Sequence, residues 1–406
     1  MSETDDLAYE GLAYEGLKVL DISQGVAGPH CGMLLARHGA SVVKLEPLAG
    51  DWGRRVGKTY GDNCAYGMAF NRGKRSLALD LKNPEGKKIA LRLANAADVV
   101  IENNRPGVTA RLGLDYDTVR RENPTVIYLS ITGFGQTGPN ANLPATDSVM
   151  QAFSGLMSVN KDAAGLPQRI NLLAIDVATG LYGFQAVAPA LYRRAVKGGG
   201  VHIKTSLMEA IGAFQSAKMI EFELEKGETA VLGVPVAMFQ AKDGYLNING
   251  RRDAHFYTMC AVIGLPELAD DPKYHTVEAR FENEDELMPL LRAAVKKMTV
   301  AALSKALSEA DVLHAPVQGY GEYFQSEHVR EVEAVRWINQ SGVGRIPMPT
   351  IPGIQPPREG DRMVHAPHLG EHSREILREL GHSDQAIDEL AANGAIGLFA
   401  DADPAA

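Results

Sequence analysis

Residues 17–47 read LKVLDISQGVAGPHCGMLLARHGASVVKLEP. The apolar run at 17–23 predicts a strand, the turn that contains Gly25 and Gly28 begins a helix through Ala36, and ASVVKLEP predicts a second strand. A strand, a glycine turn, a helix and a strand within about thirty residues form a βαβ unit, in which the strands lie parallel and the crossover is right-handed. The stretch therefore predicts an α/β fold built on a parallel sheet.

The glycines of this turn allow a test for dinucleotide binding. Gly25, Gly28 and Gly32 do not have the G-x-G-x-x-G spacing, and Pro29 stands where backbone amides would bind a pyrophosphate. Glu46, near the end of the second predicted strand, is the one feature that favours binding of a ribose. The glycines indicate a tight turn that packs the helix against the strand rather than a nucleotide site.

The composition limits the class of protein. The chain has 406 residues, of which 45% are hydrophobic, so it exceeds the usual size of a single core and predicts two domains. A net charge of -9 argues against nucleic acid as a partner, and three widely spaced cysteines indicate reduced thiols and no metal site. We expect no membrane span, because no apolar run is long enough, and a cytoplasmic location, because the acidic start MSETDD lacks the features of a signal peptide.

A second stretch, residues 131–180, contains the candidate catalytic acids. It opens with a glycine-rich turn after an apolar strand, and Asp147, Asp162 and Asp176 follow within about thirty residues of one another. Asp176 stands among aliphatic residues. Carboxylates in apolar surroundings near a glycine-rich loop favour chemistry at a carbonyl or carboxylate carbon.

Basic residues indicate an anionic ligand. Residues 51–75 carry an excess of arginine and lysine, interleaved with Trp52 and other aromatic residues, in an otherwise acidic chain. A predicted strand then leads to Arg105, and Arg111 follows six residues later. Ligands of open α/β sheets bind at the carboxyl ends of strands, so both arginines are candidates for binding an anion there. The alternative for residues 51–75 is a solvated charged face.

Several segments in a fixed order resemble one known family. They are GLKVLDISQGVAGPHCGMLLARHGASVVKLEP, NRGKRSLALDLKNPEGKKI, ADVVIENNRPGVTARLGLDYDTV, NPTVIYLSITGFGQTGP, LPATDSVMQAFSGLMS, AIDVATGLYGFQAVAPALYRR and APHLGEHSREILRELG. The series extends from Gly16 to Gly381 and resembles the class III CoA-transferases, a family that includes formyl-CoA and carnitine CoA-transferases and α-methylacyl-CoA racemase. Each motif by itself is weak, but the ordered series is specific.

The resemblance implies an architecture. A Rossmann-like large domain is expected from both ends of the chain, with its amino-terminal part at residues 1–200. A smaller α+β domain is expected at 225–325, and residues 330–406 are expected to form an extended arm that returns to the large domain. Two chains are expected to thread through each other as an interlocked dimer, either a homodimer or a heteromer with a homologue. The proline-rich segment 346–357 is then either a linker or a strap across the partner.

The resemblance also implies a site for a CoA thioester, which is expected as a substrate rather than as a permanently bound cofactor. The residues expected to bind CoA are Lys74, Arg75, Asn103, Arg105, Arg111 and Phe134. The basic side chains among them would give charge-assisted hydrogen bonds to the CoA phosphates. Asn104 departs from the family, which commonly has phenylalanine at this position, and Thr132 stands where formyl-CoA transferase has a lysine.

The family transfers CoA through an aspartate that attacks the thioester, and here the sequence departs from the expected motif. Aligning Gly165-Leu-Pro167 with the family segment places Ala164 at the position of the nucleophile. Asp162, two residues earlier, is our predicted nucleophile, with Asp176 and Asp147 as supporting acids. A simple turn aspartate is the alternative role for Asp162.

We therefore predict a CoA-transferase that moves CoA from an acyl-CoA to a carboxylic acid. The acid would be dicarboxylic if Arg251 and Arg252 bind a second carboxylate. One alternative is a catalytically silent CoA-binding subunit that pairs with an active homologue. Another is an α-methylacyl-CoA racemase, although Thr146 replaces the histidine base that the racemase branch uses.

Overall fold

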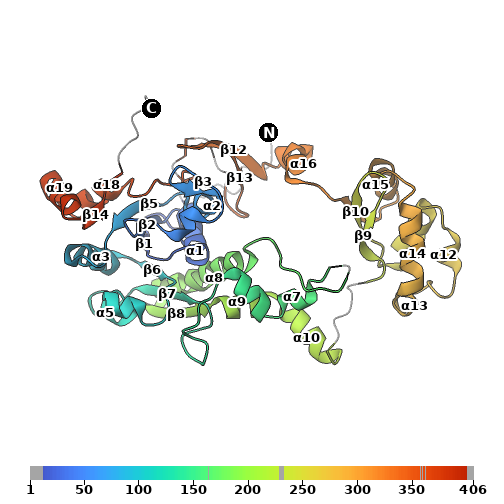
Figure 1. The fold of residues 1–406 in the computed structure, drawn as a ribbon, viewed down its shortest axis with the longest axis horizontal. Helices are drawn as coiled ribbons and strands as arrows, with labels where there is room; N and C mark the ends of the chain where they lie inside the picture. Colours follow the sequence, from blue (N-terminus) through green and yellow to red (C-terminus); the bar gives the residue numbers. More distant parts are fainter. Residues whose placement is uncertain are drawn as a thin grey trace. The chain divides into compact units, whose positions relative to one another are not determined.

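The computed structural model describes residues 12–162, 164–227, 233–356, 358, 360–361 and 363–399. The chain divides into two compact units, a large one and a small one (Figure 1). The large unit comprises the chain up to Ser216 together with the chain from Glu333 onward, and the small unit comprises Ala217–Val332. Among the described residues, none of the helices has the length and apolar composition needed to cross a bilayer.

A mostly parallel sheet with the strand order β14-β5-β2-β1-β6-β7-β8 forms the centre of the large unit. Its strands are β1 (Lys18–Asp21), β2 (Ser41–Glu46), β5 (Arg75–Leu79), β6 (Val99–Glu102), β7 (Ile127–Thr132), β8 (Val201–Ser206) and β14 (Ile396–Gly397). The strand β1 pairs parallel with β2 and with β6, whereas β14 pairs antiparallel with β5. The predicted α/β class is confirmed.

Helices cover both faces of this sheet (Figure 1). The helices of the large unit are η2 (Trp52–Arg55), α1 (Ala27–Arg37), α2 (Ala65–Asn71), α3 (Pro84–Ala96), α4 (Val108–Leu112), α5 (Tyr116–Glu122), α6 (Asp147–Phe153), α7 (Leu156–Val159), α8 (Ala174–Lys197), α9 (Leu207–Phe214), α18 (Ser373–Glu379) and α19 (Asp384–Ala392). The helices α1 and α8 pack with Val19 and Ile101 on one face. The helices α3, α5, α18 and α19 pack with Leu20 and Val100 on the other. Neighbouring strand residues point to opposite faces, which is why Val19 and Leu20 belong to different cores.

Two hairpins complete the regular structure of the large unit among the described residues. They are formed by β3 (Thr59–Tyr60) with β4 (Asn63–Cys64), and by β12 (Val335–Gln340) with β13 (Gly344–Pro349).

The small unit has a core and a sheet of its own. Its sheet has the strand order β11-β10-β9, formed by β9 (Val236–Gln240), β10 (Tyr245–Asn249) and β11 (Leu313–Pro316). The helices of this region are α10 (Ser216–Leu224), α11 (Asp253–Val262), α12 (Glu267–Asp270), α13 (Val277–Glu282), α14 (Glu284–Val295), α15 (Val300–Glu309), α16 (Tyr320–Gln325) and α17 (Glu327–Glu331). Phe239, Leu246 and Ile248 alternate toward the helices and pack with α11, α14 and α15.

Glycines in the first helical turns let α1 approach β1 closely. A Cβ atom on Gly28 would lie 2.3 Å from the Cβ of Ser23, and one on Gly32 would lie 2.8 Å from Oδ2 of Asp21. A larger residue fits at neither position without a shift of the helix or of the facing side chain. These glycines therefore serve the packing of the helix on the strand, as their spacing predicts.

Candidate active site

A cavity of about 490 Å³ opens at the carboxyl ends of β1, β6 and β7. Its walls come from the loop after β1, the loop after β6, the turn after β7 and the first turn of α8. Among the described residues of these walls, the charged side chains are those of Arg105 and Asp176. Ligands of open α/β sheets bind beyond the carboxyl ends of the strands, so this cavity is our candidate active site.

Asp147 fixes the beginning of α8. Its Oδ2 accepts hydrogen bonds from the backbone N–H groups of Ile175 (2.7 Å) and Asp176 (3.1 Å), and its Oδ1 accepts one from Nε2 of Gln151 (2.6 Å). The Asp147 side chain is buried, and these three donors hold both of its oxygens in place. Because Leu173 at the N-cap offers no side-chain acceptor, Asp147 performs the capping from a different helix.

Asp176 lies in the first turn of α8 and lines the cavity. Burial, and then the negative charge of Asp147, raise the pKa of Asp176 to about 7. Two neighbouring carboxylates therefore have different roles: Asp147 is held as an acceptor of hydrogen bonds, and Asp176 titrates near neutral pH. A carboxyl group with a perturbed pKa in a cavity is typical of a reactive group.

Gln151 is a positioning residue that the sequence did not reveal to us. Its side chain is fully buried, and its Nε2 also donates to the carbonyl oxygens of Ile170 (3.1 Å) and Leu172 (3.2 Å). Its Oε1 accepts from the N–H of Ile170 (2.9 Å). These bonds hold the segment that leads into α8 and so help to place Asp176. The signal in the sequence was an amide side chain inside a short helical segment, Gln151 of QAFSGL.

The structure does not bring Asp162, our predicted nucleophile, to this cavity. Asp162 is exposed, and its Oδ1 accepts hydrogen bonds from the N–H groups of Ala164 (2.9 Å) and Leu166 (3.0 Å). Its Oδ2 accepts one from Nε2 of Gln168 (3.0 Å). Asp162 thus stabilises its own turn, as the alternative interpretation holds, and its oxygens serve the local backbone.

Lys74, predicted to bind the CoA phosphates, is instead a buried structural residue. Its Nζ donates to Oδ2 of Asp21 (2.8 Å), the carbonyl oxygen of Pro29 (2.7 Å) and Oδ1 of Asn71 (2.9 Å), which uses all three ammonium hydrogens. The side chain is fully buried, and this burial lowers the pKa of Lys74 to about 8. The prediction is corrected because no donor of this ammonium group is left for a ligand.

Arg75 also serves the fold in this structure. It begins β5, and its guanidinium lies 2.9 Å from Glu375 and 2.5 Å from Glu379 of α18. A cavity of about 730 Å³ adjoins Arg75, but it lies at the amino ends of β1, β2 and β5, at the opposite edge of the sheet from Asp176. Arg75 therefore ties α18 to the sheet rather than adjoining the candidate active site.

The segment after β6 does reach the cavity. Asn103 lines it, but its side chain accepts from the N–H of Gln24 (2.7 Å) and donates to the carbonyl oxygen of Gln24 (2.6 Å), so it joins two loops. Arg105 is exposed and lines the cavity, and the exposed Arg111 lies beside Gly107, one turn away. Arg105 thus lies on the loop after β6 and Arg111 on α4, which follows it, and their binding of an anion stays a prediction.

Phe134 was expected to line the CoA channel. It is buried in the core on the α1 and α8 side of the sheet, and its ring packs edge-on against Phe153 with 5.0 Å between the ring centroids. In this structure it supports the turn after β7 from within the core.

Arg37 and Arg72 form a second cationic cluster that the motifs did not single out. Both are buried; Arg37 donates to the carbonyl oxygen of Met363 (3.0 Å) and lies 3.7 Å from Asp361. Among the described residues, Nε of Arg72 has no hydrogen-bond partner. Burial, and then the charge of Arg37, lower the pKa of Arg72 to about 10. Two neighbouring buried cations with a donor left over are suited to an anion.

Known proteins of one kind match the chain over nearly all of its length. The sequence model of CoA-transferase family III matches residues 14–373. The succinyl-CoA:glutarate CoA-transferase of Mus musculus is 33% identical over 94% of this chain and 90% of its own length. The acetyl-CoA:oxalate CoA-transferase of Acetobacter aceti is 33% identical over 93% of this chain and 98% of its own.

A solved structure agrees with these sequence matches. The crystal structure of a CAIB/BAIF family protein from Brucella suis superposes with a TM-score of 0.80 at 31% identity. The match covers 91% of this chain and all of that one. Sequence and fold thus agree on one ancestry: the chain belongs to CoA-transferase family III and is an enzyme that transfers CoA from an acyl-CoA to a carboxylate.

Proposed function

We propose that this enzyme transfers CoA through a covalent intermediate on Asp176. The observation that carries the proposal is the carboxyl group of Asp176 in the cavity at the carboxyl ends of the strands, with its pKa raised to about 7. A carboxylate of raised pKa is a stronger nucleophile than an ordinary aspartate and still ionises at physiological pH. The role that the sequence assigned to Asp162 therefore passes to Asp176.

The proposed reaction needs the two substrates and the carboxyl group of Asp176. An oxygen of Asp176 attacks the thioester carbonyl carbon, and the carbon–sulfur bond breaks. CoA leaves as a thiolate, and a mixed anhydride of the acyl group with Asp176 remains. The thiolate then attacks the Asp176 acyl carbon, which gives an aspartyl-CoA thioester and releases the first acid. A carboxylate oxygen of the second acid attacks the carbonyl carbon of this thioester, CoA leaves again as a thiolate, and a second mixed anhydride forms. The thiolate then attacks the acyl carbon that comes from the second acid, which gives the new acyl-CoA and releases Asp176 as a free carboxylate. The covalent steps conserve the thioester that hydrolysis would destroy.

Polar groups of the same cavity suit the charge that develops at the carbonyl oxygen. Gln24 and Asn104 line the cavity with amide groups, and Gly133 presents backbone with no side chain. Donors placed around a forming oxyanion stabilise the transition state more than the ground state. We assign this role to the loops after β1 and β6.

The phosphates of CoA are assigned to two clusters. Arg105 lines the cavity, and Arg111 lies beside Gly107 on the following helix. Arg37 with Arg72 lies at the far end of α1, which has 11 residues and so spans about 16 Å. The cavity includes Ala27, the first residue of the same helix. The cavity and the arginine pair thus lie at opposite ends of α1.

Removal of the Arg72 side chain tests this assignment. Arg72→Met is expected to raise KM for the acyl-CoA by about tenfold or more while kcat changes by less than about threefold, because a charge-assisted bond to a remote phosphate acts on binding. Steady-state kinetics over a range of acyl-CoA concentrations measure both constants. Arg75→Met is the matched control and should leave KM unchanged. Equal effects of the two variants would contradict the assignment.

The acid is proposed to be dicarboxylic. The relatives named above act, by their names, on glutarate and oxalate, which supports this class. Arg251 and Arg252 are exposed in the small unit and stay candidates for binding the second carboxylate. The racemase alternative is weakened by Thr146, which lines the cavity where that branch has a histidine. The silent-subunit alternative loses its motivation once Asp176 replaces Asp162.

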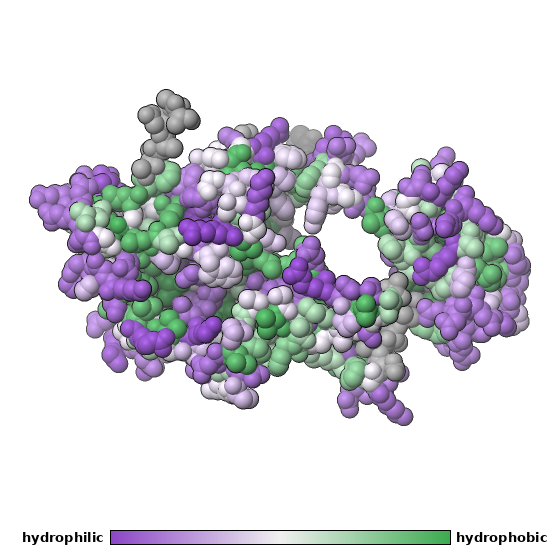
Figure 2. Space-filling view, viewed as in Figure 1, coloured by the Kyte–Doolittle hydropathy of each residue, from purple (hydrophilic) through white to green (hydrophobic). Residues whose placement is uncertain are grey.

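We also keep the expected assembly as a proposal. The Rossmann-like large domain with its inserted small domain would form an interlocked dimer, most simply of two identical chains. Exposed apolar side chains support association, since Leu181, Tyr192 and Val196 of α8 are 49%, 73% and 60% exposed. Figure 2 shows apolar side chains at the surface of α9, where Phe214 is 65% exposed. The cytoplasmic location stays a prediction.

Trapping the intermediate tests the proposed chemistry. The enzyme incubated with succinyl-CoA or acetyl-CoA is expected to carry a hydroxylamine-sensitive adduct on the peptide that contains Asp176, which mass spectrometry detects. Asp162→Ala is expected to form the same adduct and to keep kcat within about threefold, because the partners of its side chain among the described residues lie in its own turn. An adduct on the Asp162 peptide, or its loss in Asp162→Ala, would return the nucleophile to Asp162.

A further inference from the structure

Trp52 is the first residue of η2 and lies in the wall of the cavity that contains Asp176. Its side chain is 53% exposed, whereas Asp51 and Arg54 on either side of it are 1% and 3% exposed. A large apolar ring that faces a cavity presents a surface for an apolar part of a ligand. The contrast between the exposed ring and its buried charged neighbours needs an explanation.

The ring rests directly on the loop after β1. A Cβ atom on Gly25 would lie 2.1 Å from Cζ2 of Trp52, so a glycine is required beneath the indole. Gly25 also has φ of +80°, a conformation that other residues adopt at a cost. One side of the ring is therefore fixed against the Gly25 backbone, and this contact sets the direction in which the ring extends along the cavity wall.

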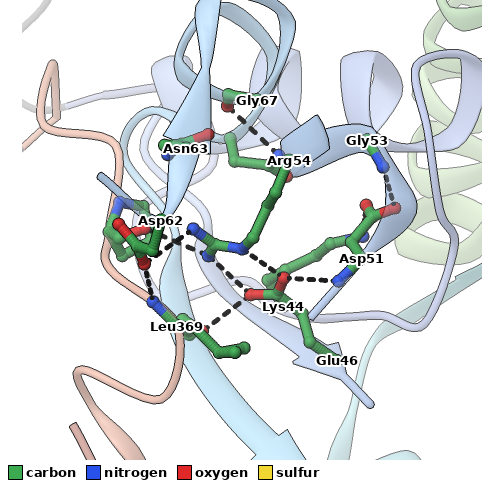
Figure 3. Close-up of polar contacts among 12 residues, drawn as sticks. Lys44, Glu46, Asp51, Gly53, Arg54, Asp62, Asn63, Gly67 and Leu369 are labelled. Atoms are coloured by element: carbon green, nitrogen blue, oxygen red, sulfur yellow. Dashed lines mark hydrogen bonds and ion pairs between the residues drawn. The ribbon is translucent and has the colours of Figure 1, made fainter. Parts of the chain in front are cut away.

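Asp51 holds both partners of this contact. Its Oδ1 accepts hydrogen bonds from the N–H groups of Gly25 (2.8 Å) and Gly53 (2.7 Å), and the second of these is drawn in Figure 3. Its Oδ2 lies 3.1 Å from Nζ of Lys44. Lys44 lies on β2 and is fully buried. The loop under the ring and the turn that carries the ring are thus attached to the sheet through one carboxylate.

Arg54 holds the other side of the turn. Its Nε and Nη2 donate to the two carboxylate oxygens of Glu46 at 2.6 and 2.7 Å (Figure 3). Its Nη2 also donates to the carbonyl oxygen of Pro367. Bidentate pairs of this kind fix geometry as well as charge. Buried ion pairs contribute little net stability, so their placement on both sides of an exposed indole indicates that the position of the indole matters.

We infer that Trp52 selects the carbon chain of the acid that reacts at Asp176. The inference rests on the proposed function, and it names the specificity-determining residue of that site. The indole forms an apolar wall along which the methylene groups of a dicarboxylic acid pack while one carboxylate reacts. Asp51 and Arg54 are positioning residues that hold this wall. The acids favoured are those with methylene groups between their carboxylates.

The expected effect grows with the length of the acid. Complete removal of one methylene group from water raises kcat/KM by about fourfold. The indole covers one side of the carbon chain, so it contributes part of this increase for each methylene group. Oxalate has no methylene group, whereas glutarate has three. Removal of the ring should therefore lower kcat/KM strongly for glutarate and little for oxalate.

A chain-length series tests the inference. The enzyme is assayed with succinyl-CoA as donor and with oxalate, malonate, glutarate and adipate as acceptors, for the wild type, Trp52→Ala and Trp52→Phe. In the wild type, kcat/KM is expected to rise from oxalate to glutarate. In Trp52→Ala the rise should be at least about fivefold smaller, with oxalate changed by less than about threefold, and Trp52→Phe should lie between them.

Trp337→Phe is the matched control, because the sequence has two tryptophans and Trp337 lies on β12, outside the walls of this cavity. Its chain-length series should match the wild type. A Trp52→Ala series that keeps the wild-type slope, or that falls equally for every acid, would overturn the inference and leave the proposed function standing. A wild type that transfers CoA to none of these acids would instead refute the proposed function, and the inference with it.

Discussion

Asp176→Asn is expected to lower kcat by at least about three orders of magnitude and to abolish the covalent adduct. Asparagine keeps the size of the side chain but removes the nucleophilic carboxylate, and losing the nucleophile of a covalent mechanism removes most of the rate enhancement. Single-turnover kinetics with a radiolabelled acyl-CoA measure the loss. Residual activity within about tenfold of the wild type would show that another residue attacks the thioester.

The pH dependence should identify the same group. Burial and the charge of Asp147 raise the pKa of Asp176 to about 7, and the reaction needs its ionised form, so kcat/KM should rise with pH and level off above about pH 7. The raised pKa means that the folded state binds a proton more tightly than the unfolded state between about pH 4 and pH 7. The contribution of Asp176 to stability is therefore present at low pH and is lost as the pH rises through about 7.

The direction of this change in stability with pH provides a control for the Asp176 variant. Because asparagine cannot ionise, Asp176→Asn should unfold at the same or a higher denaturant concentration than the wild type at pH 8. An inactive variant that is also less stable at pH 8 would leave unfolding as the cause of the lost activity. An inactive variant of equal or greater stability assigns the loss to chemistry.

Arg54→Met is expected to destabilise the large unit by about 3–5 kcal/mol. The change leaves the buried carboxylate of Glu46 without its bidentate partner, and an uncompensated buried charge is strongly destabilising. The midpoint of urea unfolding, followed by circular dichroism, measures the change. Arg75→Met removes an arginine that pairs with exposed glutamates on the surface and should cost less than about 1 kcal/mol.

A double variant separates lost charge pairing from lost packing. Arg54→Met combined with Glu46→Met removes both charges, and a buried ion pair replaced by apolar residues of similar volume commonly regains stability. We expect the double variant to be more stable than Arg54→Met. A double variant less stable than the single one would mean that the bonds of Glu46 to Ser76 and to the Asp51 backbone outweigh the charge effect.

The βαβ unit could be predicted because its signals are local. An apolar run, a glycine turn and a helical stripe follow one another in residues 17–47, and each predicts its own element without knowledge of the rest of the chain. The order of motifs then indicated the family. The strand β14 had no such signal, because a strand of a few residues at Ile396 joins the sheet through pairing with a segment more than three hundred residues away.

The site was harder to predict because its charges are paired across the chain. Lys74 looks like a phosphate ligand in the sequence, but it is neutralised by Asp21, 53 residues earlier. The sequence shows that a side chain is cationic and does not show whether a buried acid already binds it. Asp176 and Asp162 are both aspartates near glycines, and what separates them is the burial of Asp176 and its closeness to Asp147, which lies 29 residues earlier in the chain.

The pairing of β14 with β5 affects the order in which the chain can fold during synthesis. The exposed edge of β5 stays unpaired until β14 leaves the ribosome, so the large unit cannot complete its sheet before the chain has been made through Ile396–Gly397. The small unit is one continuous stretch with a core of its own, and it is available for folding earlier. The nascent chain therefore has an open strand edge for much of its synthesis, and such edges are where chaperones and misassembly compete.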